Sequence, residues 1–182
     1  MRIIVFDVEI MESIESTPGG WEAARRGDCG ISTTVLWDSD TNRYHIYGAE
    51  NLNELAAHLN KADWLVSFNG LNFDVPCIEG VTGWEITANH YDILDAIWKA
   101  VGKKHKGWGL GKVAERTVGL GKTDTGEHAP ELARQGRWAT LIDYCINDVH
   151  ITKELFFHIL LEGFVVGPDG DRVEIEVPDA LR

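Results

Sequence analysis

The chain has 182 residues, 44% of them hydrophobic, and a net charge of −12. Its seven Trp, six Phe and four Tyr exclude a disordered, solvating segment, and its length allows a full core in one domain. The apolar runs are too short to span a bilayer, the start has no signal-peptide pattern, and three widely spaced cysteines fit neither a disulfide framework nor a zinc motif, so we expect a cytoplasmic protein without membrane contact.

Hydrophobic spacing and turn residues divide the chain into alternating elements. Residues 2–9 predict a strand buried on both faces, because its first half is nearly all β-branched or aromatic. A turn cluster at 38–42 joins two strands into a hairpin. Strands are expected at 2–9, 31–38, 43–47, 64–68 and 86–91, and helices at 21–26, 52–59, from 73 onwards, and at 93–101, 110–118, 130–135 and 138–161.

The order of these elements predicts the fold class. A hairpin-rich start followed by alternating helices and strands is typical of an α/β domain with a mixed sheet. Residues 164–177 place apolar runs on either side of Gly167-Pro168-Asp169-Gly170, which predicts a C-terminal β-hairpin. We therefore expect one domain over residues 1–182, with a core at about 2–161 and a hairpin at about 164–177.

Two acids stand at the end of the first predicted strand. Side chains alternate across a strand, so Asp7 and Glu9 share a face with the apolar Ile3 and Val5. Like charges on a buried face are unfavourable unless something positive lies there. The alternative is that the strand simply ends and both carboxylates reach water.

Two further acids, Asp148 and Asp74, lie in a predicted helix and just after a predicted strand. The long helix 138–161 has an apolar stripe that includes Leu141, Cys145 and Leu155, and Asp148 falls on it. A buried acid needs a cation or several hydrogen bonds, which a buried Arg or a second element would also provide. Asp74 follows the fourth strand and a turn, where an ordinary acid at a helix N-terminus is the alternative.

These four acids come from a strand end, a loop and a helix, which a sheet can gather at its C-terminal edge. All-oxygen ligands select hard cations, and two such ions clamp the oxygens of a phosphodiester under cleavage. The sequence therefore predicts a site for two Mg²⁺ or Mn²⁺ ions at Asp7, Glu9, Asp74 and Asp148.

Three segments resemble the exonuclease motifs of the DEDD group of the ribonuclease H-like (DnaQ-like) superfamily. They are Phe6-Asp7-Val8-Glu9, Asn69 to Asp74 (Asn-Gly-Leu-Asn-Phe-Asp) and Tyr144-Cys145-Ile146-Asn147-Asp148. The Tyr-x-x-x-Asp form is that of the DEDDy subgroup, and the last two motifs look like those in the proofreading domains of B-family DNA polymerases. The resemblance covers residues 2 to about 161.

The resemblance implies a ribonuclease H-like mixed sheet flanked by helices and a 3′→5′ exonuclease. It implies metal ligation by the four acids, a catalytic role for Tyr144 on the attacking water, and a substrate contact at Asn69. Ile10 departs from the pattern, since the family usually has Thr after the motif's Glu. We expect no polymerase domain within these 182 residues.

Positive charge gathers in one window of this acidic chain. From Lys99 to Lys122 there are seven bases and one acid, so the window carries +6, with six glycines among them. We expect its Lys103, Lys104 and Lys106 to contact the phosphate backbone and Trp108 to stack on a base. The alternative is a solvated basic face with Trp108 in the core.

The leading hypothesis is thus a metal-dependent 3′→5′ exonuclease that releases nucleoside 5′-monophosphates, with a single-stranded 3′ end of nucleic acid as its partner. An RNA-directed nuclease on the same site is the alternative within enzymes. A catalytically silent nucleic-acid-binding module and a structural acidic protein are the alternatives outside them. DNA and RNA are not distinguished by the sequence, because recognition of the 2′-hydroxyl depends on pocket geometry.

Overall fold

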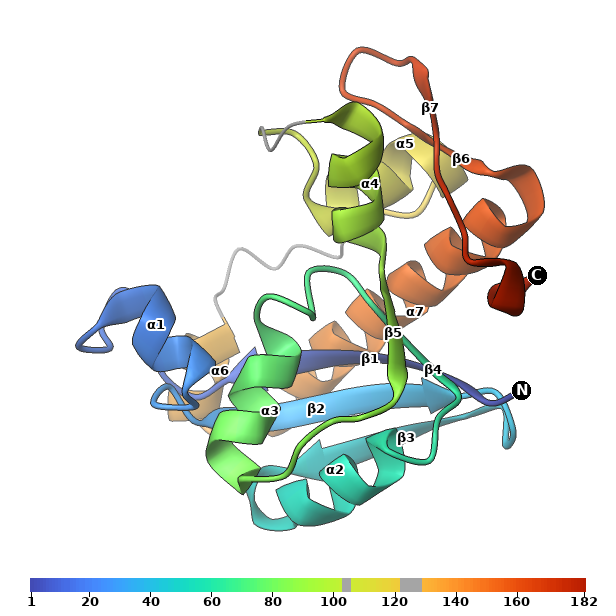
Figure 1. Cartoon of the computed structure of the whole chain (residues 1–182). Helices are drawn as coiled ribbons and strands as arrows, with labels where there is room; N and C mark the ends of the chain where they lie inside the picture. The colour runs from blue at the N-terminus through green and yellow to red at the C-terminus, as the bar shows by residue number, and fades with distance from the viewer. Residues whose placement is uncertain (103–105, 122–128) are drawn as a thin grey trace.

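A mixed five-stranded sheet forms the centre of the computed structural model, which describes residues 1–102, 106–121 and 129–182 (Figure 1). The strand order is β3-β2-β1-β4-β5. The bounds are β1 Ile3–Ile10, β2 Ile31–Asp38, β3 Arg43–Gly48, β4 Trp64–Ser67 and β5 Asn89–Asp92. Strand β2 runs antiparallel to both of its neighbours, β1 and β3, and β4 and β5 run parallel to β1.

The strands differ in length in a way that shapes the sheet edge. β1 pairs with β2 from Ile4 as far as Ile10, with a shift in register between Glu9 and Ile10. Its pairing with β4 stops at Val5, opposite Val66, so among the described residues no strand pairs with the second half of β1 on that side. β5 begins three residues later than its expected start at Ile86, because it pairs only with the four residues of β4.

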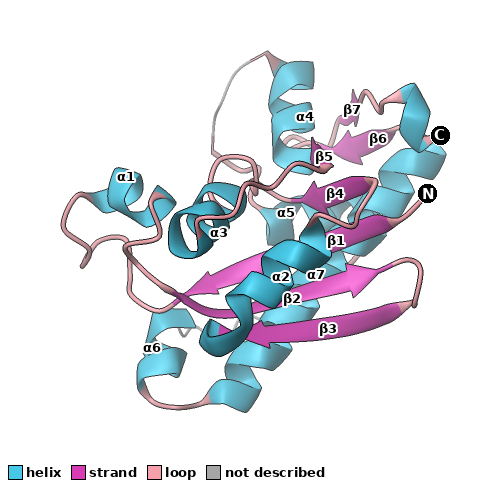
Figure 2. Ribbon diagram, turned by 60° about the horizontal axis from the view of Figure 1, so that its bottom comes forward, coloured by secondary structure: helices cyan, strands magenta, loops and turns pink. Residues whose placement is uncertain are grey.

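Helices cover both faces of the sheet (Figure 2). The long α7, Trp138–Glu162, lies on one face, and α2, Leu52–Leu59, and α3, Asp74–Thr82, lie on the other. The remaining helices are α1 Gly20–Arg25, α4 Ile93–Val101, α5 Leu110–Val118 and α6 Ala129–Arg134, with 3₁₀ turns at Ala49–Asn51 and Asp179–Leu181. In the described part of the chain no helix combines the length and the apolar run that a membrane crossing needs.

The alternation of β1 divides the core into two layers. Ile3 and Val5 pack with α7, while Ile4, Phe6 and Val8 pack with α2 and α3. Both faces of the strand are buried, as its β-branched and aromatic composition predicts. The mixed sheet flanked by helices confirms the fold class expected from the sequence.

The C-terminal hairpin is also confirmed, as β6 Phe164–Val166 and β7 Arg172–Glu174. It packs on α5 through polar contacts as well as apolar ones. The Val166 backbone N–H donates to the Thr117 hydroxyl at 3.0 Å, and Arg116 Nε donates to the Val166 carbonyl at 3.1 Å. The hairpin is therefore anchored to the last turn of α5.

Candidate active site

Asp7 and Glu9 remain part of the sheet rather than leaving it for water. Pairing with β2 continues through both residues, opposite Val35 and Thr33, and Glu9 is only 9% exposed. Both carboxylates follow Ile3 and Val5 on the face toward α7. The interpretation in which the strand ends at these acids is therefore wrong, and of the two carboxylates Glu9 is buried while Asp7 is half-buried.

Asp74 enters beside β1 where β4 has ended. The register that pairs Val5 with Val66 would place position 69 beside Val8, but Asn69 adopts a left-handed φ of 76° and turns the chain away. The Val8 N–H, left without a strand partner, donates to Asp74 Oδ1 at 3.0 Å. The first residue of α3 thus takes the place of a neighbouring strand.

Burial makes Asp74 an unusual acid. It is 5% exposed, and desolvation raises its pKa to about 7, with the negative charge of Asp92 adding to the rise. The hydrogen bond from Val8 opposes this effect. A carboxyl group with this pKa is poised to exchange its proton for a cation near neutral pH.

Asp92 at the end of β5 organises the loop that carries Asp74. Its carboxylate accepts hydrogen bonds from the Asn69 and Leu71 N–H groups, at 2.9 and 3.0 Å. It also caps α4 by accepting from the Leu94 and Asp95 N–H groups. One buried side chain therefore ties the loop after β4 to the start of a helix.

A second contact at this loop comes from Ser67, the last residue of β4. Its hydroxyl lies 2.8 Å from His90 Nε2 and accepts from the Gly70 N–H at 3.1 Å. Burial lowers the pKa of His90 to about 4, so the imidazole stays neutral. A Cβ on Gly70 would lie 2.3 Å from this hydroxyl, which explains glycine at that position.

The third motif lies on α7, facing β1. Asp148 is 3% exposed, in agreement with its place on the apolar stripe, and Tyr144 lies one turn before it. Cys145 is fully buried, with Sγ 3.5 Å from the Asp7 carbonyl oxygen and 3.7 Å from Asp7 Oδ2. Burial and the charges of Asp7, Glu9 and Asp148 raise the pKa of this thiol.

Two of these carboxylates and the thiol are close neighbours in space. Ligand atoms of Asp7, Glu9 and Cys145 lie within 4.8 Å of one another. Because Cys145 is held in its protonated form, the anionic donors of the cluster are carboxylate oxygens. This donor set fits a hard divalent cation such as Mg²⁺ or Mn²⁺.

A second group of potential ligands, at the opposite end of β2, does not fit a cation. Asp38, His45 and His58 also have ligand atoms within 4.8 Å of one another. Arg2 lies among them, with Nη2 at 2.7 Å from Asp38 Oδ2 and 2.9 Å from His58 Nε2. A guanidinium therefore already neutralises this carboxylate.

The basic window is described only in part, since Lys103, Lys104 and Lys122 lie outside the described residues. Lys106 is exposed. The expectation that Trp108 stacks on a base is wrong, because this residue is 4% exposed. A Cβ on Gly167 would lie 3.3 Å from the Trp108 ring, which packs under the hairpin.

Sequence reasoning missed Asp92 and Cys145. An acid directly before the helix at 93–101 is a recognisable N-cap signal, but its reach to the loop at 69–71 depends on the sheet order. Cys145 lies on the apolar stripe, where it reads as a core residue. Its contact with Asp7 follows from the packing of α7 on β1.

A model of the RNase_H superfamily matches residues 25–160. The chain belongs to the RNase_H superfamily. The matched range includes Asp74, Tyr144 and Asp148 and begins after Asp7 and Glu9. A search of curated proteins found no match.

The fold of this superfamily member is also similar to a solved polymerase structure. The family B DNA polymerase from the hyperthermophilic archaeon Pyrobaculum calidifontis matches with a TM-score of 0.67 and 17% sequence identity. The match covers 88% of this chain and 24% of the polymerase. At this identity the likeness concerns the fold, and the chain spans about a quarter of the polymerase's length.

Proposed function

We propose that this protein is a DEDDy-type, metal-dependent 3′→5′ exonuclease that releases nucleoside 5′-monophosphates from nucleic acid. The observation that carries the proposal is the cluster of Asp7, Glu9 and Cys145, with the buried Asp148 one turn after Cys145 on α7 and Asp74 hydrogen-bonded to the strand between Asp7 and Glu9. Membership of the RNase_H superfamily supports it.

In this proposal the carboxylates of Asp7, Glu9, Asp74 and Asp148 hold two Mg²⁺ or Mn²⁺ ions. When bound, the ions supply positive charge against the phosphate and its developing oxyanion. The sheet and α7 hold the carboxylates at fixed positions before substrate arrives, so little reorganisation accompanies the reaction.

Tyr144 is assigned to the attacking water. Tyr144 precedes Asp148 by one helical turn on α7, so the two side chains are neighbours on one face, and in this proposal the hydroxyl orients a water molecule beside the carboxylate. Asn69, at the turn that leads to Asp74, and the exposed Lys106 are assigned to the substrate's backbone. Lys103 and Lys104 are assigned there from the sequence alone.

The three cysteines are buried thiols, which supports the expected reducing, cytoplasmic location.

The test is digestion of end-labelled single- and double-stranded DNA and RNA with Mg²⁺, with Mn²⁺ or with EDTA. A 5′-labelled strand should shorten one nucleotide at a time, and a 3′-labelled strand should lose its label at once as a nucleoside 5′-monophosphate. Asp148→Ala should abolish cleavage. Asp143→Ala on the same helix is the matched control, because Asp143 is exposed.

Each alternative has its own result in this assay. Cleavage of RNA alone would identify an RNA-directed nuclease, and binding without cleavage would identify a silent binding module. Full activity in EDTA would contradict the metal-dependent mechanism. Equal loss of activity in the Asp143→Ala control would show that damage to α7, rather than loss of a ligand, explains the result.

A further inference from the structure

The aromatic ring of Trp21 lies largely in water close to the carboxylate cluster. Trp21 on α1 is 56% exposed. Its ring packs edge-on against Phe73, with 5.7 Å between ring centroids and an interplanar angle of 77°. Phe73 directly precedes Asp74, whose carboxylate bonds to β1 between Asp7 and Glu9.

Close backbone contacts fix α1 in this position. A Cβ on Gly80 of α3 would lie 2.3 Å from the Arg26 carbonyl oxygen, and a Cβ on Gly27 would lie 2.8 Å from the Val81 nitrogen. Two glycines thus let the end of α1 touch the backbone of α3. Arg25 Nε also donates to the Asn72 carbonyl at 2.8 Å. The segment is therefore held against both the helix and the loop that carry Asp74.

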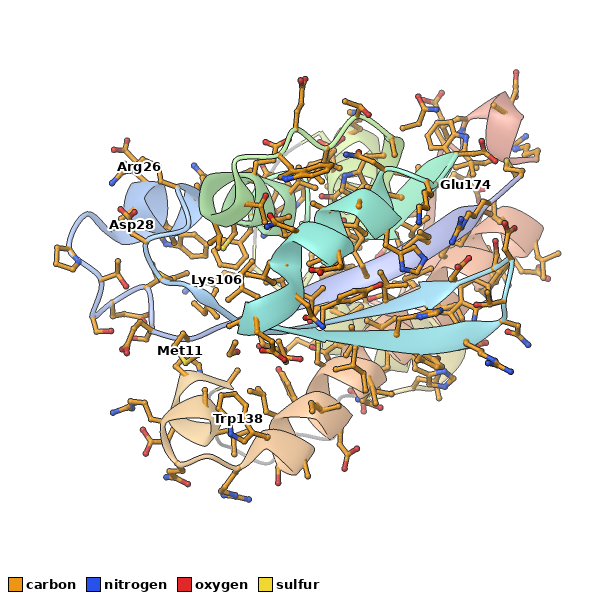
Figure 3. The ribbon with its side chains drawn as sticks, turned by 90° about the horizontal axis from the view of Figure 1, so that it is seen from below. Met11, Arg26, Asp28, Lys106, Trp138 and Glu174 are labelled. Carbon is orange, nitrogen blue, oxygen red and sulfur yellow. The ribbon has the colours of Figure 1, made fainter. Side chains whose placement is uncertain are left out.

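Most of the Trp21 indole is left open to solvent beside its contact with Phe73. The helix is anchored by Ala23 and Ala24, both fully buried, while Trp21 lies on the solvent side. The same segment carries the exposed Arg25 and Arg26, and Arg26 pairs with Asp28 at 3.0 Å (Figure 3). A large aromatic face beside cations is a combination that binds single-stranded nucleic acid.

We propose that Trp21, whose ring packs edge-to-face with Phe73, stacks on an unpaired base at the 3′ end of a single-stranded nucleic acid. This inference rests on the proposed function, since the carboxylate cluster is what would bring a 3′ end to this place. Every base has a π-face, so the contact gives affinity for unpaired ends without sequence preference. It also replaces Trp108, which is buried, as the residue that contacts bases.

The test compares single variants in the whole protein. Dissociation constants for a labelled single-stranded oligonucleotide are measured in EDTA, and KM and kcat are measured with Mn²⁺. Trp21→Ala should raise Kd and KM about fivefold or more with kcat nearly unchanged, the loss that one base stack produces. Trp21→Phe should retain most of the affinity. Trp21→Leu keeps an apolar contact with Phe73 but has no π-face, and should bind as weakly as Trp21→Ala.

Trp84 provides the matched control. It is 46% exposed and follows the opposite end of α3 from Phe73. Trp84→Ala should leave Kd and KM at wild-type values. An equal effect of Trp84→Ala, or wild-type affinity in Trp21→Ala or Trp21→Leu, would overturn the assignment while cleavage by the wild type still supports the exonuclease. A wild type that neither binds nor shortens the oligonucleotide would overturn the exonuclease proposal and this inference together.

Discussion

The raised pKa of Asp74 makes the metal-free site a source of instability, and Asp74→Asn should remove it. Asparagine has nearly the same shape, and its carbonyl oxygen can accept the Val8 N–H as Asp74 Oδ1 does. The substitution therefore removes a buried negative charge and keeps the contact with β1. In the absence of divalent metal, the variant should be more stable than the wild type above neutral pH.

The direction and size of the effect follow from proton linkage. Burial, together with the charge of Asp92, raises the pKa of Asp74 from the ordinary 3.8 to about 7. A carboxyl that is more easily protonated when folded favours folding at low pH, and this contribution is lost as pH rises from about 4 through about 7. At roughly 1.4 kcal/mol for each tenfold change in acidity, the full loss is about 4 kcal/mol. In a chain of this size, this loss of stability would lower the Tm of the metal-free wild type on the order of 10 °C.

The assay is thermal or denaturant unfolding of wild type and Asp74→Asn in EDTA between pH 4 and pH 8. The difference in unfolding free energy should be smallest at pH 4 and largest at pH 8. Mn²⁺ at a hundred times its dissociation constant should stabilise the wild type by about 2.7 kcal/mol and leave the variant unchanged. Asp143→Asn, an exposed acid on α7, is the control and should follow the wild type. A wild type and variant with the same pH dependence would refute the argument that Asp74 is a strained, metal-binding acid.

Two further variants test the roles assigned within the site. Tyr144→Phe should lower kcat at least tenfold with little change in KM, because its hydroxyl is assigned to the attacking water. General acid–base catalysis usually raises a reaction rate by about 10²–10⁴. Equal single-turnover rates of variant and wild type would show that Tyr144 is a packing residue. Lys106→Glu should raise KM and weaken its dependence on salt, since each phosphate contact contributes about one to the slope of log affinity against log salt concentration. An unchanged slope would show that Lys106 does not contact the substrate.

The carboxylates were accessible to sequence reasoning because each one breaks a local pattern. Asp148 lies on the apolar stripe of α7, where a core residue is expected, and its side chain is buried. Asp7 and Glu9 follow β-branched residues on one face of a strand, and period-two alternation alone predicts that they share that face. Charges in apolar positions are rare enough to be informative without any structure.

Contacts that depend on packing were not accessible in the same way. Trp108 lies in a glycine-rich basic window, a composition typical of a surface loop, yet the C-terminal hairpin covers it. Its burial depends on where residues 164–174 return to the domain, and nothing near Trp108 in the sequence carries that information. The same holds for Gly27 and Gly80, whose contact joins two helices far apart in the sequence.

The end of β4 explains why an acid can reach the middle of the sheet at all. Strand β4 has four residues, and β1 continues five residues beyond its last pair, Val5 with Val66. If β4 extended by two or three residues, its backbone would take the Val8 N–H and occupy the position of Asp74. The left-handed turn at Asn69, held by Asp92, prevents that extension. The edge of β1 beyond the end of β4 and the carboxylate cluster are therefore one feature, and a change that lengthened β4 would remove the site without touching any of its four acids.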